Sequence, residues 1–262
     1  AQHTYGLVCR DYEEILTFAK QNNIHIIDDC AQATGAEYEK RKLGYFSTAA
    51  FYSMQNSKII SCGDGGIAAT NNDSLASRIN VVQEKSTEVP KEWIINTLYA
   101  IKRIFYNNDN IFKGKLCNKY YQIRGRHTPI NVNVDESNGS IGGNYIKKFP
   151  DSLAILATHQ LSKIDSLNQR RIKNAEMWNE WATDYNFEIP HITMNSTPVF
   201  LRYPISSRNS LLRILHKDCG GKINIGYWKR FLTCGTKEIQ PDSLFLPNAK
   251  YAIENIINLP CL

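Results

Sequence analysis

One lysine stands out because of its setting. In the stretch AFYSMQNSKIISCGDGGIAAT, Lys58 lies between two apolar, strand-like runs, with Ser53 five residues before it and a Gly-Asp-Gly-Gly turn after it. A lysine in such surroundings is uncommon, because burying an ammonium group is costly. A neutral lysine amine can instead attack a carbonyl and form a Schiff base. The stretch therefore suggests that Lys58 holds a carbonyl compound covalently.

If that compound is pyridoxal phosphate, three further groups are needed: a carboxylate facing the ring nitrogen, donors for the phosphate, and a small or flat group against the ring. Asp29 ends a strand-like run and could supply the carboxylate, while Ser53 could bind the phosphate. Ala31 is small enough to lie under a ring, and Gln32 could donate to its oxygen. Each residue taken alone is better explained as structural, since an aspartate at a strand end is most often a cap.

The elements that must position these residues alternate between helix and strand. Helices are predicted at 11–23 and 72–85, and strands at 24–29, 48–53 and 66–70. This alternation indicates an α/β fold with a mostly parallel sheet. Ligands of such sheets bind at the carboxyl ends of the strands. Asp28, Asp29 and Ser53 are expected at those ends.

The rest of the chain is predicted to form an insertion and a second domain. Residues 91–108 have helical periodicity, which fits either a surface helix for a membrane or partner or a packed helix of a subdomain. Residues 109–140 are predicted as loop. One long helix is expected from Pro150, followed by strands at 197–205 and 222–227, a helix at 207–218 and a closing helix. We therefore expect a large domain at 1–150, with an insertion at about 88–140, and a small α+β domain at 151–262.

Composition excludes several classes of protein. The seven cysteines are odd in number and form no Cys-x-x-Cys pair, which argues against a disulfide framework and against a zinc or other metal site, and favours a reducing, cytoplasmic compartment. The net charge is +6, but the basic residues are scattered along the sequence and no nucleic-acid-binding motif is present. No apolar run is long enough to span a membrane, and the start of the chain has no signal-peptide pattern. The absence of an initiator methionine suggests a trimmed or partial chain.

A longer pattern contains these residues. The segment HTYG, a helix, and then IIDDCAQATGAEYEKRKLGYFSTAAFYSMQNSKIISCGDGGIAATN together resemble the DegT/DnrJ/StrS family of nucleotide-sugar aminotransferases. The segments GGNYIKKFPDSLAILATHQLSKID and FLPNAKYAIENIINLPCL resemble later parts of the family pattern, more weakly. The resemblance implies the aspartate-aminotransferase-like fold called fold type I. It implies a partial large domain, a small C-terminal domain and pyridoxal phosphate as cofactor.

The resemblance also implies roles for individual residues. Lys58 would form the Schiff base and act as the proton-transfer base, and Asp29 would pair with the ring nitrogen. The other cofactor-binding residues implied are Ala31 against the ring, Gln32 at its oxygen, Ser53 at the phosphate, and Asn144. Because the family residue that matches Asn144 reaches the phosphate of the neighbouring subunit, a homodimer with shared active sites is expected.

The implied reaction transfers an amino group, from glutamate, to a keto group of a nucleotide-linked sugar, in a pathway such as polysaccharide biosynthesis. Lys58 argues against sugar dehydration, since the family's dehydratases carry a histidine at this position.

The chain departs from the family at Asp28 and Asp64, where glutamate is usual, and at Ile146, where arginine is usual. The family's N-terminal phosphate loop has no counterpart in the sequence. An alternative is therefore a truncated, catalytically impaired or regulatory relative that dimerises but binds the cofactor poorly. A plain α/β binding module, the third possibility, would tolerate replacement of Lys58.

Overall fold

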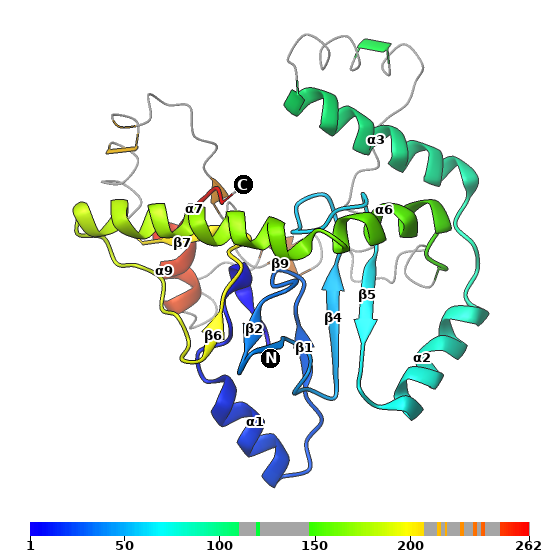
Figure 1. The fold of residues 1–262 in the computed structure, drawn as a ribbon, viewed down its shortest axis with the longest axis horizontal. Helices are drawn as coiled ribbons and strands as arrows, with labels where there is room; N and C mark the ends of the chain where they lie inside the picture. The colour runs from blue at the N-terminus through cyan, green and yellow to red at the C-terminus, as the bar shows by residue number, and fades with distance from the viewer. Residues whose placement is uncertain are drawn as a thin grey trace.

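A three-stranded sheet lies at the centre of the N-terminal part of the chain (Figure 1). The structure, a computed structural model, describes residues 1–109, 119–120, 147–206, 214–215, 218, 226–227, 233–234, 237–238 and 247–261. Its strands are β1 (Ile27–Asp29), β4 (Ala49–Ser53) and β5 (Gly66–Ala69), in the order β1-β4-β5. β1 and β4 are parallel, and Gln2 forms a further parallel bridge to Asp29 on the other side of β1.

The last strand of this sheet runs in the direction opposite to the one predicted. β5 pairs antiparallel with β4, so the sheet is mixed rather than parallel throughout. Parallel neighbours need a crossover that returns the chain to the starting edge, usually through a helix. Residues 54–65 connect β4 to β5 directly and contain no helix, which explains the antiparallel pairing.

Two helices predicted from sequence are confirmed. The helix α1 (Tyr12–Gln21) has Glu13 and Glu14 in its first turn and Lys20 in its last, which suits the helix dipole. The helix α2 (Asp73–Lys85) begins at Asn72, whose side chain accepts a hydrogen bond from the Leu75 N–H at 2.9 Å.

The helix α3 (Lys91–Asp109) packs against the segment that contains Lys58. Trp93, Leu98 and Ile101 contact the apolar cluster that includes Ile60 and Cys62. This supports the packed-helix alternative for this face of α3, although Ile95 and Ile104 remain exposed. Most of the loop predicted at 109–140 lies outside the described residues.

Two helices occupy the place of the single long helix expected after Pro150. They are α6 (Asp151–Leu161) and α7 (Ile164–Asp184), which run one after the other across the end of the sheet where β4 ends (Figure 1). At the break, the Ser162 hydroxyl donates to the His159 carbonyl at 2.9 Å. Such side-chain bonds compete with the hydrogen bonds of the helix.

A second sheet follows near the C-terminus. Its strands are β7 (Tyr203–Ile205), β11 (Ile257–Leu259) and β8 (Gly226–Tyr227), all antiparallel, in the order β7-β11-β8. The helix α9 (Pro247–Asn255) precedes β11. Apolar side chains of α7, of β7 and β11, and of the segment before β7 form one buried cluster that includes Ala175, Ala182, Phe200, Tyr203, Ile205, Ile257 and Leu259.

The remaining strands are short. One small sheet has the order β3-β2-β6, and the other pairs β9 with β10. Their bounds are Glu37–Tyr38 for β2, Arg41–Lys42 for β3, Ser196–Thr197 for β6, Thr233–Cys234 for β9 and Lys237–Glu238 for β10; a short 3₁₀ helix, η1, covers Thr4–Gly6.

The strand predicted at 197–205 is interrupted, because Phe200 adopts φ = 45° and the chain there bonds to residues 5 and 6 instead. Most of the helix predicted at 207–218 lies outside the described residues, and residues 214, 215 and 218 of it are described and helical. Most of the strand predicted at 222–227 also lies outside the described residues.

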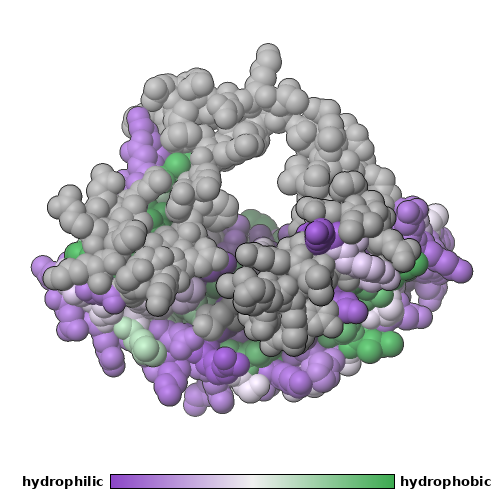
Figure 2. All heavy atoms as spheres, turned by 90° about the horizontal axis from the view of Figure 1, so that it is seen from above, coloured by the Kyte–Doolittle hydropathy of each residue, from purple (hydrophilic) through white to green (hydrophobic). Residues whose placement is uncertain are grey.

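The described surface is mainly polar in the view of Figure 2, where hydrophilic side chains are interrupted by separate apolar areas. Among the residues that the structure describes, no helix has both the length and the apolar character needed to cross a lipid bilayer.

Candidate functional site

Asp29 and Ser53 lie at the same end and on the same face of the central sheet. Asp29, the last residue of β1, is paired with Phe51 in the parallel register, and Ser53 follows two residues later as the last residue of β4. Side chains two residues apart on a strand share a face. A strand rises about 3.3 Å per residue, so Ser53 lies roughly 7 Å further along than Phe51. The structure thus brings together two groups predicted to bind one cofactor.

The Asp29 carboxylate is held by the turn that follows it. Its Oδ1 accepts a hydrogen bond from the Ala31 N–H at 3.0 Å, and both residues are half-buried. The Cys30 N–H donates to the Phe51 carbonyl at 2.9 Å, which continues the pairing of the two strands by one residue. These bonds fix where the carboxylate lies relative to β4.

Gln32 is oriented by the N-terminal segment. Its Oε1 accepts a hydrogen bond from the Tyr5 N–H at 2.8 Å. Because the carbonyl side of this amide is occupied, its NH₂ group remains as the donor. The role predicted for Gln32, donation of a hydrogen bond to the ring oxygen of the cofactor, requires such a donor. The role itself stays a prediction.

Lys58 belongs to the connection between β4 and β5. The Met54 N–H donates to the Gly65 carbonyl at 2.9 Å and the Cys62 N–H to the Met54 carbonyl at 3.1 Å, so the two ends of this loop are tied together. Lys58 is half-buried, and its N–H donates to the Gln55 carbonyl at 3.0 Å. Within the described part of the chain, its amine makes no hydrogen bond or ion pair.

The face that carries Asp29 and Ser53 is open. Ile27 and Phe51 lie on the same face and are 59% and 44% exposed. The opposite face is covered, since Ala50 and Tyr52 pack with Tyr12 of α1 and Ile164 of α7. Parallel strands are usually covered on both faces, so exposed apolar side chains here mark a surface that can receive another group.

Asp28, the neighbour of Asp29, points to the covered face and is fully buried. Tyr12 Oη donates to its Oδ2 at 2.6 Å, and His3 Nε2 lies 3.4 Å from its Oδ1. Burial alone would raise the pKa of Asp28, but the contacts with His3 and Tyr12 outweigh burial and hold it below its ordinary value. Asp28, which the sequence placed with Asp29 at the site, is therefore a buried structural carboxylate.

His3, Asp28 and Cys30 have potential metal-ligating atoms within 4.8 Å of one another. His3 Nδ1 accepts a hydrogen bond from the Cys9 N–H at 3.1 Å, so the proton of a neutral imidazole is on Nε2, the atom that faces Asp28. Burial, aided by Asp28, raises the pKa of Cys30 to about 12 and keeps its thiol protonated. A protonated nitrogen and a thiol are poor ligands, which favours a hydrogen-bonded cluster over a metal site.

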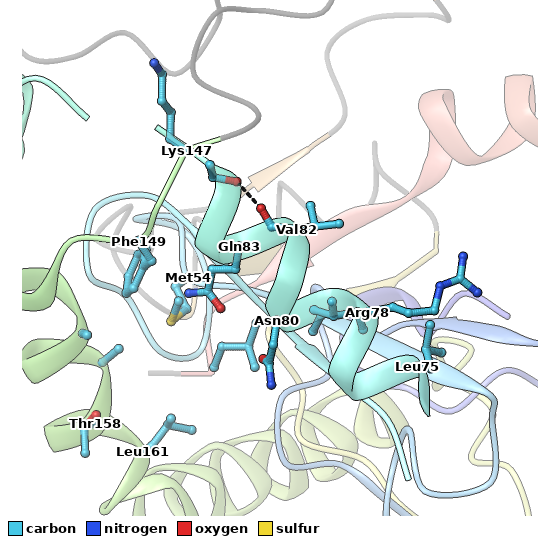
Figure 3. Close-up of a pocket in the computed structure, with 17 residues that line it drawn as sticks. Met54, Leu75, Arg78, Asn80, Val82, Gln83, Lys147, Phe149, Thr158 and Leu161 are labelled. Carbon is cyan, nitrogen blue, oxygen red and sulfur yellow. Dashed lines mark hydrogen bonds between the residues drawn. The ribbon is translucent and has the colours of Figure 1, made fainter. Parts of the chain in front are cut away.

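A cavity of about 810 Å³ lies beside the site, between α2 and α6 (Figure 3). Met54 and Gly66 line it, and these residues directly follow and pair with Ser53. Phe149 and Leu161 contribute to its apolar wall, while Arg78 and Lys147 extend in different directions from its ends (Figure 3). None of the predicted cofactor-binding residues that the structure describes lines the cavity.

One residue predicted from the sequence cannot be placed in the structure. Two further residues, not predicted from the sequence, contact the loops of the candidate site in the structure. Asn144 lies outside the described residues. Gln160 of α6 and Asn168 of α7 form hydrogen bonds to the loops that carry Lys58 and Gln32. The available signal was that Gln160 and Asn168 fall at the three- to four-residue spacing of the apolar helical positions around them.

Comparisons with known proteins agree with the pattern in the sequence. The model of the DegT/DnrJ/EryC1/StrS aminotransferase family matches residues 1–262. The L-glutamine:2-deoxy-scyllo-inosose aminotransferase of Streptomyces kanamyceticus is 28% identical over 195 residues, which are 74% of this chain and 37% of that protein.

Solved structures show the same fold. A DegT DnrJ EryC1 StrS aminotransferase from Brucella abortus superposes with a TM-score of 0.64 at 21% identity, over 99% of this chain and 57% of the other. The E. coli GDP-4-keto-6-deoxy-D-mannose-3-dehydratase with bound hydrated PLP gives 0.62 at 15% identity, over 98% and 61%. The chain thus spans little more than half the length of these solved relatives.

Proposed function

Because the chain belongs to the DegT/DnrJ/EryC1/StrS aminotransferase family, we propose that it binds pyridoxal phosphate and transfers an amino group from glutamate to a keto group of a nucleotide-linked sugar. One observation carries the proposal: Asp29 and Ser53 share an open face of the sheet at the end where the Lys58 loop begins. Ligands of such sheets bind at this end. The proposal concerns the whole protein, of which this chain matches a part.

The residues at this edge suit the cofactor chemically. The candidate residues offer a carboxylate, a hydroxyl, an amide donor and a primary amine, and the proposal assigns each of them to a different part of the cofactor. Phe51, the cross-strand neighbour of Asp29, lies on the same face two residues before Ser53, and its exposed side chain offers an apolar surface against which a flat ring can pack. When bound, pyridoxal phosphate supplies an electron sink for the bond that breaks at the amino-bearing carbon.

Each residue has a distinct role in this proposal. Lys58 would hold the cofactor covalently through its amine and would afterwards move a proton to or from the reacting carbon. Asp29 would keep the ring nitrogen protonated, which is the state in which the ring accepts electrons. Ser53 would donate to the phosphate, Gln32 would donate an NH₂ hydrogen to the ring oxygen, and Ala31 would pack beside the ring.

The substrates are proposed from chemistry and from the names of the relatives. The E. coli neighbour acts on a GDP-linked 4-keto sugar, and the S. kanamyceticus relative is an aminotransferase that uses L-glutamine. A net charge of +6 is compatible with an anionic nucleotide sugar. Glutamate remains our proposed donor, with glutamine as the comparison in the test.

The other features of the working protein are proposals as well. We place the boundary between the domains at residue 150, next to the start of α6, and expect a cytoplasmic homodimer in which Asn144 reaches the phosphate bound by the other subunit.

An impaired relative that binds the cofactor poorly is the second candidate. The open sheet face is compatible with either candidate, because a surface that can receive the cofactor can equally be one that lacks its covering. Retention of the cofactor distinguishes the two.

The test is a half-reaction with the chain loaded with pyridoxal phosphate. L-glutamate and L-glutamine are added separately, and release of the corresponding keto acid is measured, with Lys58→Ala as the inactive variant and Lys85→Ala as the matched surface control. The proposal expects keto-acid release that Lys58→Ala abolishes and Lys85→Ala retains. Cofactor retention without release would contradict amine transfer, and failure to retain the cofactor would favour the impaired relative.

A further inference from the structure

Gln160 binds the main chain of the loop that carries Lys58. Its Oε1 accepts a hydrogen bond from the Ser61 N–H at 2.8 Å, and its Nε2 donates to the Ser61 carbonyl. The side-chain amide therefore satisfies both polar groups of one residue, as a neighbouring strand would do. Ser61 is three residues after Lys58, and the two residues between them, Ile59 and Ile60, are buried.

Asn168 binds the other loop of the candidate site. Its Nδ2 donates to the Thr34 carbonyl at 3.1 Å, and Thr34 is two residues after Gln32. The neighbouring residue, Gly35, has φ = 88°, and a side chain at this position would overlap the Asn168 amide. The loop is therefore shaped to bring its backbone against this asparagine.

Within the described residues, the Asn168 amide has a partner for its NH₂ group and none for its oxygen. The side chain is buried. A buried polar atom without a partner is unfavourable. An apolar residue of similar shape would avoid this penalty, but it would leave the Thr34 carbonyl unbound.

Both amides belong to one helical pair. Gln160 is near the end of α6 and Asn168 is in the second turn of α7, after the break at 162–163. Further along α7, Arg171 donates to the carbonyls of Phe200 and Leu201 at 3.4 and 3.3 Å, which fixes the helix to the segment before β7. The α6–α7 pair is therefore tied at separate points to the Lys58 loop, to the Gln32 loop and to the C-terminal part.

From these contacts we propose that Gln160 and Asn168 are positioning residues, which set the Lys58 loop and the Asp29–Gln32 loop relative to one another. That the two loops enclose a cofactor rests on the proposed function. The hydrogen bonds to Ser61 and Thr34 are features of the structure and do not depend on that proposal. Neither residue touches the reacting groups, so both act through the main chain of the loops.

The test compares two glutamines of the same helical pair. Gln160→Met keeps the length of the side chain and removes both bonds to Ser61, whereas Gln169→Met changes an exposed residue of α7. Amide hydrogen exchange at Ser61 should become about tenfold faster in Gln160→Met only, as expected for the loss of about one hydrogen bond. Asn168→Leu should likewise speed exchange at the Ala36 amide, which is bonded to the Ala33 carbonyl in the second loop.

A second readout separates positioning from simple stabilisation. In protein loaded with pyridoxal phosphate, the pH midpoint of the visible absorbance of the Lys58-bound cofactor should be displaced in Gln160→Met and unchanged in Gln169→Met. Faster exchange with an unchanged midpoint would overturn the positioning role, as would equal behaviour of the two glutamine variants. If the unsubstituted chain never binds the cofactor at Lys58, the proposed function fails, and exchange at Ser61 alone decides whether Gln160 holds the loop. Should Asn168→Leu fail to fold, the comparison of the two glutamine variants still decides between the outcomes.

Discussion

Tyr12 donates a hydrogen bond of 2.6 Å to Asp28, on the face of the sheet opposite to that of Asp29. Two adjacent carboxylates thus have different environments, because successive side chains on a strand point to opposite faces. Asp28 is buried with Tyr12 and His3, whereas Asp29 is half-buried on the open face. This separation leaves Asp29 available to a ligand while Asp28 joins β1 to α1 and the N-terminal segment.

Tyr12→Phe should destabilise the chain by roughly 1–3 kcal/mol, because it leaves a buried carboxylate with one donor fewer. Loss of this donor should also raise the pKa of Asp28, so acid unfolding should begin at a higher pH. Urea unfolding followed by circular dichroism measures both effects. Tyr45→Phe, at an exposed tyrosine, is the matched control. Equal stability of the two variants would show that the bond contributes nothing.

The stability of the chain should fall in acid through Asp28. Its pKa is lower in the folded chain than its ordinary value, so its contribution is present above the ordinary pKa and is lost as pH falls through the folded pKa. The free energy of unfolding should therefore decrease below about pH 4. Asp28→Asn should remove this part of the pH dependence and lower stability at neutral pH. Asp11→Asn, at an exposed residue, should keep the slope; the same slope in Asp28→Asn would refute the assignment.

Gly63→Ala should be strongly destabilising, by about 1–3 kcal/mol. Gly63 has φ = 97°, and a methyl group there would overlap Thr97 Cγ2 of α3 and lie 3.2 Å from Ile101 Cδ1. Adding Thr97→Ala should recover part of the loss, since it removes the overlapping methyl but not the backbone strain. A double-mutant cycle of unfolding free energies measures this coupling. Strictly additive effects would show that α3 does not support the loop after Lys58.

Local patterns were sufficient to predict the elements around the site. The acidic first turn of α1 and the Asn72 cap of α2 identified both helices, and short apolar runs identified β4 and β5. The motif around Asp29 and Lys58 identified the family, which the match over residues 1–262 confirms. The roles assigned to individual site residues remain predictions.

Contacts between distant residues could not be predicted in this way. The bonds of Gln160 to Ser61 span 99 residues, and the bond of Asn168 to Thr34 spans 134. A helical repeat shows that these positions belong to a helix, but it does not show which loop lies against them. The direction of β5 and the break between α6 and α7 depended similarly on connections that periodicity does not report.

The most direct test is to find where pyridoxal phosphate becomes attached. The chain is incubated with the cofactor, treated with borohydride, digested, and its labelled peptides are identified by mass spectrometry, beside Lys58→Ala and Lys85→Ala. We predict a label on Lys58 that disappears in Lys58→Ala and persists in Lys85→Ala. Equal labelling of surface lysines, or no label at Lys58 in a folded chain, would contradict the proposed role of Lys58.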